Sequence, residues 1–159
     1  MKPKNLIFRE TTQVPAERTA AEIVTELVKA GASQVNTEYA NGDIVGLRWI
    51  MRIDGVDRLF TMPARVEPVY KLMEKRAKEH AVYSWGKPQQ IAELKAKARR
   101  VAWRQLLAWI QAQLAMTECG MADRLEVFFA YVNSNEGQTL FDVFRGGGLK
   151  ALPPAGKTQ

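Results

Sequence analysis

The side chains that most often carry catalysis or bind metals are scarce in this chain of 159 residues. It contains one histidine, His80, and one cysteine, Cys119. A Ser-His-Asp site, a Cys-His site or a histidine-rich metal site needs several such groups together. We interpret His80 and Cys119 as groups at two predicted helix ends, and we expect no catalytic residue, no metal site and no cofactor.

Acidic pairs and glycines give equally little support for an enzyme. Glu22 and Glu26 fall opposite the apolar face of a predicted helix, which indicates a solvated pair, and Glu118 and Asp123 straddle a helix break. The glycine run at 146–148 follows no predicted strand and opens no helix, so it resembles neither a Walker loop nor a dinucleotide fingerprint. We therefore expect a protein that is not an enzyme.

Positive charge is the chemical feature that stands out, because it is confined to one region. Residues 64–104 hold 11 basic and 4 acidic side chains, whereas the rest of the chain holds 12 basic and 13 acidic. Cations that neutralise phosphates, next to rings that stack on bases, are typical of nucleic-acid surfaces. The residues that we predict for such a surface are Lys71, Lys75, Arg76, Lys78, Tyr83, Trp85, Lys97, Arg100 and Arg104.

The same pattern has other interpretations. Basic helices are also common as plain solvated faces or as surfaces for an acidic protein. A second patch, on the outer face of a predicted sheet, favours a protein contact because an apolar pair lies between arginines; it comprises Arg48, Ile50, Arg52 and Leu59. A small-ligand pocket lined by Trp49, Phe60 and Trp103 is a third hypothesis, although such rings are more simply core residues.

The elements that must position these residues begin with a helix and a hairpin. Apolar residues at helical spacing follow Pro15, and Gly31 ends that helix. Alternation predicts a strand over 45–53 with Val45, Leu47, Trp49, Met51 and Ile53 on one buried face. The tight turn Asp54-Gly55 pairs this strand with 56–63, so that Trp49 faces Phe60 and Arg52 faces Asp57.

The loop before that strand has two interpretations. A two-residue loop at Asn41-Gly42 places Glu38 and Asn36 on the core side. A three-residue loop that includes Ala40 places Thr37 and Val35 there instead. Because a slip by one residue inverts every side chain, we predict the three-residue loop.

Helices dominate the rest of the chain. We predict a helix over 66–78 with Val69, Leu72, Met73 and Ala77 inside, and a long helix over 88–120 on which Lys97, Arg100 and Arg104 line one exposed strip. Asp123 and Thr139 are predicted caps of two short helices.

The predicted fold is α+β. A three-stranded antiparallel meander is covered by the long central helix, in the order α-β-β-β-α-α plus short C-terminal helices, as a two-layer sandwich. A single domain spans residues 1–145, and a flexible C-terminal tail spans 146–159. Because a lone cysteine forms no internal disulfide and the longest apolar stretch contains Arg104, we expect a cytoplasmic protein without membrane contact.

Three segments carry a resemblance: 47–51 running into 62–66, 100–107, and 112–116 leading to 126–129. Over roughly residues 10–144 the chain resembles a group of small proteins encoded in bacteriophage and prophage genomes, for which no activity is assigned. The resemblance implies a bacterial host cytoplasm and genes for phage replication, recombination or takeover of the host.

Two hypotheses for function follow. The first is a phage or prophage accessory protein that binds nucleic acid through a basic helical face, largely without sequence specificity. The alternative is a protein-interaction module that inhibits or modulates a bacterial host or defence protein.

Overall fold

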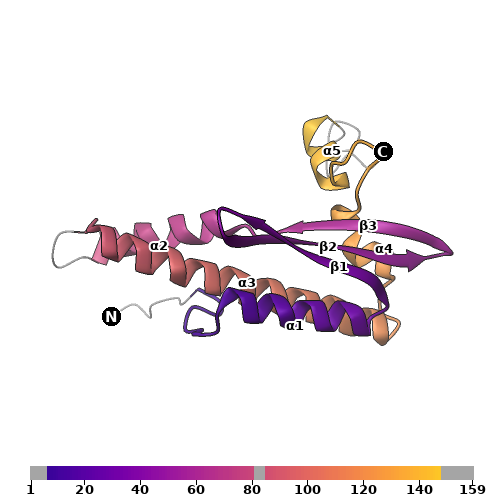
Figure 1. Ribbon diagram of the computed structural model, residues 1–159, viewed down its shortest axis with the longest axis horizontal. Helices are drawn as coiled ribbons and strands as arrows, with labels where there is room; N and C mark the ends of the chain where they lie inside the picture. Colours follow the sequence, from indigo (N-terminus) through magenta and orange to yellow (C-terminus); the bar gives the residue numbers. More distant parts are fainter. Residues whose placement is uncertain (1–6, 81–84, 148–159) are drawn as a thin grey trace, which may run out of the picture.

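The computed structural model describes residues 7–80 and 85–147, and its elements follow the predicted order (Figure 1). Three strands form one antiparallel sheet in the order β1-β2-β3, so the predicted α+β class and meander are confirmed. The main elements are α1 (Ala16–Lys29), β1 (Ala32–Ala40), β2 (Asp43–Ile53), β3 (Val56–Pro63), α2 (Val66–His80) and α3 (Pro88–Glu118). Shorter ones follow: α4 (Arg124–Phe128), the 3₁₀ turn η1 (Phe129–Tyr131) and α5 (Leu140–Gly146).

The hairpin between β2 and β3 has the predicted register. Trp49 faces Phe60, and Arg52 faces Asp57 on the outer side. Asp54 and Gly55 both have positive φ, 50° and 78°, as a two-residue turn with the twist of the flanking strands requires. The turn and the alternation of apolar residues therefore determine this pairing.

The hairpin between β1 and β2 differs from the prediction. Its loop is the two-residue turn Asn41-Gly42, with Ala40 paired to Asp43. A register shift follows, in which Tyr39 pairs with Ile44 but the next residue, Glu38, pairs with Gly46. The predicted three-residue loop is wrong, but this bulge restores the expected side, with Thr37 opposite Leu47 and Val35 opposite Trp49.

The bulge also changes which residue of β2 is buried at its start. Ile44 is buried, whereas Val45 is exposed, contrary to the prediction for Val45. Gly46 lies against the neighbouring strand, where an added Cβ would be 3.0 Å from the Met62 carbonyl oxygen. The alternation predicted from 47 onward is correct, because β2 pairs regularly with β3 beyond this point.

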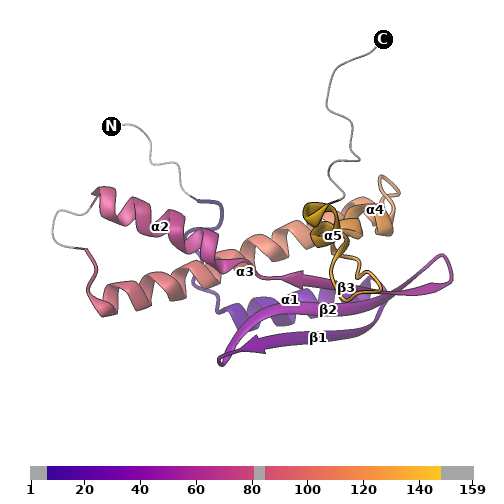
Figure 2. The same cartoon turned by 90° about the horizontal axis from the view of Figure 1, so that it is seen from above.

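One face of the sheet is covered by α1 and α3 together, with α1 on the side away from α5 (Figures 1 and 2). Trp49 stacks on Phe60 with centroids 5.1 Å apart, and Phe128 packs edge-on against both. Trp103 is fully buried in the same cluster. These rings fill the core, so the hypothesis of an open ligand pocket lined by Trp49, Phe60 and Trp103 is wrong.

The first half of α3 packs against α2 as a helical hairpin that extends beyond the sheet (Figure 2). Its own small core contains Tyr70, Met73, Ala98 and Val101, with Ile7 packed against it. Leu72, predicted inside, is exposed, and Tyr70 takes the inner position. Ile7 belongs to no strand, and its neighbour Phe8 is exposed.

The last elements are attached to the edge of β3. Val132 bridges to Phe60, and the backbone N–H of Asn133 donates to the carbonyl of Leu59 at 2.8 Å. Both predicted caps are confirmed: Asp123 accepts from the N–H of Leu125, and Thr139 accepts from the N–H of Asp142. α5 includes Gly146, one residue past the predicted domain boundary, and the predicted tail from 148 onward lies outside the described residues.

Candidate interaction surfaces

Three lysines predicted for a nucleic-acid surface, Lys71, Lys75 and Lys78, occupy an exposed stripe of α2. Each has a carboxylate one helical turn away, in the pairs Lys71–Glu67 at 3.9 Å, Lys75–Glu79 at 4.0 Å and Lys78–Glu74 at 3.2 Å. The hydroxyl of Tyr70 also donates to Glu74, and the hydrogen bonds from Tyr70 and Lys78 lower the pKa of the Glu74 carboxyl. The stripe therefore alternates in charge.

Two further cations of the predicted surface, Arg76 and Lys97, hold the N-terminal segment against the helical hairpin. Both approach Glu10, at 3.9 Å and 3.4 Å, and the backbone N–H of Ile7 donates to the same carboxylate at 2.9 Å. Burial raises the pKa of Glu10, but the Ile7 hydrogen bond and the two cations outweigh it, so the pKa is lowered overall. Glu10 is thus a charged group that stabilises the fold.

One of the two remaining cations of the predicted strip on α3 faces α1. Arg104 pairs with Glu22 of α1 at 2.8 Å. Arg100 is half-buried, and its Nε has no hydrogen-bond partner among the described residues. The spacing of Lys97, Arg100 and Arg104 predicted one side of α3 correctly, but that side is half-buried against other parts of the chain.

Of the two aromatic residues predicted to stack on bases, Trp85 is half-buried and Tyr83 lies outside the described residues. Six of the seven predicted cations have a carboxylate within 4.0 Å. Those carboxylates reduce the field that the cations present to a distant polyanion. The structure therefore presents six of these cations along α2 and α3 as ion pairs.

The outer face of the sheet carries the four residues predicted for a protein contact. Ile50 pairs directly with Leu59 at its centre, and the arginines lie on either side along β2. Arg48 pairs with Glu38, while Arg52 donates to the carbonyl of Gly55 and lies 3.9 Å from Asp57. Leu59 is exposed and Ile50 half-buried, so an apolar centre with a polar rim is present.

α5 is a surface that the sequence did not reveal. It stands apart from the body, on the side of the sheet opposite to α1 (Figure 1). Three of its large apolar side chains are exposed: Phe141 (40%), Val143 (40%) and Phe144 (37%). A cap and an apolar pattern predicted the helix; they could not predict that these side chains would stay partly exposed.

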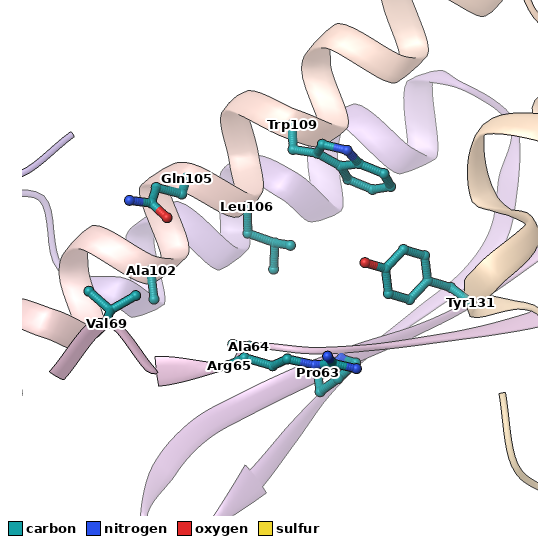
Figure 3. Close-up of a pocket in the computed structure, with 9 residues that line it drawn as sticks. All are labelled: Pro63, Ala64, Arg65, Val69, Ala102, Gln105, Leu106, Trp109 and Tyr131. Carbon is teal, nitrogen blue, oxygen red and sulfur yellow. The ribbon is translucent and has the colours of Figure 1, made fainter. Parts of the chain in front are cut away.

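A pocket of about 280 Å³ lies between α3, η1 and the junction of β3 with α2 (Figure 3). Trp109, Leu106 and Gln105 line it from α3, Arg65 lines it from the junction, and the hydroxyl of Tyr131 points into it. Trp109 packs edge-on against Tyr131 with centroids 5.6 Å apart. Sequence reasoning missed this site, because its members belong to elements far apart in the chain.

Within residues 7–80 and 85–147, no group of three or more His, Cys, Asp or Glu side chains could hold a metal ion. Nor does this part of the chain contain a helix with the length and apolar character to cross a bilayer.

The fold and these surfaces define an α+β protein with one open sheet face and a projecting apolar helix. Comparison with protein-family models, curated proteins and solved structures finds no match to this chain. The resemblance to phage and prophage proteins therefore stays a prediction.

Proposed function

We propose that this chain is a protein-interaction module whose α5 docks into an apolar groove of a partner protein. The observation that carries the proposal is the exposure of Phe141, Val143 and Phe144 on one short helix that projects from the body (Figure 1). Exposed aromatic side chains that gather on one element are typical of interaction sites. Insertion of a helix into a groove would remove this surface from water.

The outer face of the sheet supports the same proposal. It opens on the side on which α5 stands (Figures 1 and 2), and Ile50 and Leu59 form an apolar centre between arginines. A partner that binds α5 could extend over this face, with Arg48 and Arg52 at its rim. The resemblance to phage and prophage proteins favours a bacterial host or defence protein as the partner.

The test compares capture of a partner by the full chain and by two variants of α5, Val143→Ser and Phe144→Ser. Bacterial lysate is treated with nuclease first, so that nucleic acid cannot bridge the proteins. We expect a stoichiometric protein partner whose affinity falls by about tenfold or more in each variant, since truncation of an interface anchor costs about 2 kcal/mol. Phe141 is left intact, because its ring contacts Arg65.

Two control variants separate docking by α5 from general stickiness. Arg145→Ser changes an exposed polar residue of the same helix, and Leu72→Ser removes an exposed apolar side chain from α2. Both should bind as the unmodified chain does. The proposal is wrong if no stoichiometric protein is retained, or if Leu72→Ser weakens capture as much as Phe144→Ser.

Nucleic-acid binding is a second candidate, which the exposed lysine stripe of α2 favours. The side chains of Lys71, Lys75 and Lys78 are 71%, 74% and 57% exposed. Because exposed ion pairs contribute only about 0–1 kcal/mol, a phosphate could compete with their glutamates. If the three lysines contact three phosphates of duplex DNA, the slope of log K against log salt is about −2.7.

This candidate is tested by titration of oligonucleotides at several salt concentrations. The double variant Lys71→Gln/Lys75→Gln should make this negative slope less steep, reducing its magnitude by about 2. Lys29→Gln is the matched control, since Lys29 of α1 is equally exposed and paired with Glu26 at 4.0 Å. A slope near zero, or equal losses in the control and the double variant, would rule out this stripe as a binding surface.

A further inference from the structure

We propose that the pocket formed by Arg65, Gln105, Leu106, Trp109 and Tyr131 binds a small aromatic carboxylate. The proposal does not depend on docking by α5. It rests on the shape of the pocket, on the charge of its lining and on the way in which Arg65 is held.

The lining of the pocket is mostly apolar, with a few polar groups at its edge (Figure 3). α3 supplies Ala102, Leu106 and the Trp109 indole along one side. The Tyr131 hydroxyl points into the space between α3 and the junction that carries Arg65. An apolar pocket with a few convergent polar groups is the usual form of a small-molecule site.

The charge of the lining selects the ligand. Arg65 is the charged side chain among the nine lining residues, and none of the nine is acidic. A neighbouring hollow shares Arg65 but contains Asp43 and Glu67, and there Arg99 already pairs with Asp43 at 2.6 Å. Of these two pockets, the first therefore offers an anion a cation without a competing carboxylate in the lining.

Arg65 is positioned for this role by α5. Its guanidinium lies over the ring of Phe141, 5.2 Å from the centroid. Among the described residues, no carboxylate pairs with it. A guanidinium held over a ring keeps its N–H edge free, and that edge matches the two oxygens of a carboxylate.

The size of the pocket suits a ligand with a small body. A volume of about 280 Å³ has room for one ring with a short acidic chain. Because Trp109 and Tyr131 pack edge-on into one aromatic wall, a flat ring can pack against them. The natural source is either a free aromatic acid or the C-terminal carboxylate of a chain that ends in an aromatic residue.

The test follows the indole N–H signals of the full ¹⁵N-labelled chain by NMR during titration with 3-phenylpropionate. Trp109→Phe assigns the Trp109 signal. We expect this signal to shift, while those of the fully buried Trp49 and Trp103 move less. The matched uncharged probe, 3-phenylpropionamide, should bind about tenfold more weakly. A short peptide that ends in phenylalanine, with a free or an amidated terminus, distinguishes the two sources.

Two arginine variants test whether Arg65 is the group that binds the carboxylate. Arg65→Gln should weaken the acid about tenfold and leave the amide unchanged, while Arg58→Gln, an exposed arginine outside the pocket, should change neither. If the peptide with a free terminus binds more tightly than 3-phenylpropionate, the ligand is a chain terminus. If it binds equally or more weakly, the ligand is a free acid. The proposal is overturned if neither acid shifts Trp109, if the amides bind as tightly as the acids, or if Arg65→Gln binds like the unmodified chain.

Discussion

Replacement of Glu10 by glutamine tests how the N-terminal segment is held to the helical hairpin. The side chain of Glu10 is 18% exposed and lies between Lys97 at 3.4 Å and Arg76 at 3.9 Å. The amide of glutamine keeps an oxygen that can accept the hydrogen bond from the N–H of Ile7, so the substitution removes mainly the charge. A cost to folding therefore reports the two ion pairs.

The expected magnitude lies between two limits. Exposed ion pairs contribute about 0–1 kcal/mol, and breaking a fully buried pair costs about 3–5 kcal/mol. Glu10 is partly buried, but the side chains of both cations are more than a third exposed. We expect Glu10→Gln to lower the free energy of unfolding by about 1 kcal/mol at neutral pH. Glu10→Ala should cost about 1 kcal/mol more, because the N–H of Ile7 then loses its partner.

The dependence on pH follows from the lowered pKa of Glu10 in the folded state. In the unfolded chain the pKa returns to its ordinary value of about 4.5. A carboxyl with a depressed folded pKa stabilises the fold fully above the unfolded value, and this contribution is lost as the pH falls through the folded value. The difference in stability between the unmodified chain and Glu10→Gln should therefore be present at pH 7 and disappear well below pH 4.

Urea unfolding at neutral and acidic pH, followed by circular dichroism, measures both differences. Glu79→Gln is the matched control, since its pair with Lys75 is long and exposed, at 4.0 Å, and it should cost less than about 0.5 kcal/mol. The reasoning is refuted if Glu10→Gln costs no more than Glu79→Gln at neutral pH. It is refuted as well if the cost is the same at both pH values.

Three further predictions concern packing and capping. Gly46→Ala should lower the free energy of unfolding by about 1–3 kcal/mol, because its Cβ would lie 3.0 Å from the Met62 carbonyl; an unchanged urea midpoint would contradict this. Trp103→Ala should cost about 3–5 kcal/mol by the same measurement, since its ring is fully buried. Thr139→Ala should cost about 1 kcal/mol of local stability and speed amide exchange in α5, whereas equal exchange rates would show that the cap contributes nothing.

Features that depend on neighbours along the chain were predictable. The turn Asp54-Gly55 requires two residues that tolerate positive φ, and the alternation beyond Leu47 then sets the register with β3. The caps Asp123 and Thr139 depend on hydrogen bonds two or three residues away. Such requirements involve only residues that are close together in the sequence, so the sequence alone is enough to predict them.

The start of β2 was not predictable in the same way. Ile44 is buried in place of Val45 because of the bulge before Gly46. The backbone of Met62 and Pro63 approaches Gly46 there, and both residues belong to another strand. The tight packing between strands decides this register. The sequence pattern of the first hairpin alone therefore could not predict it.

By itself, the sequence determined the α+β architecture, the long central helix and the concentration of basic residues around it. Only the tertiary structure decided what surrounds those residues. Lys97 meets Glu10 from 87 residues away, and Arg104 meets Glu22 from 82 residues away. Spacing along a helix fixes which side chains share a face. The groups that pack opposite that face come from segments far away in the sequence, which only folding brings close. For the same reason Arg65, Trp109 and Tyr131 form one pocket only once the chain is folded.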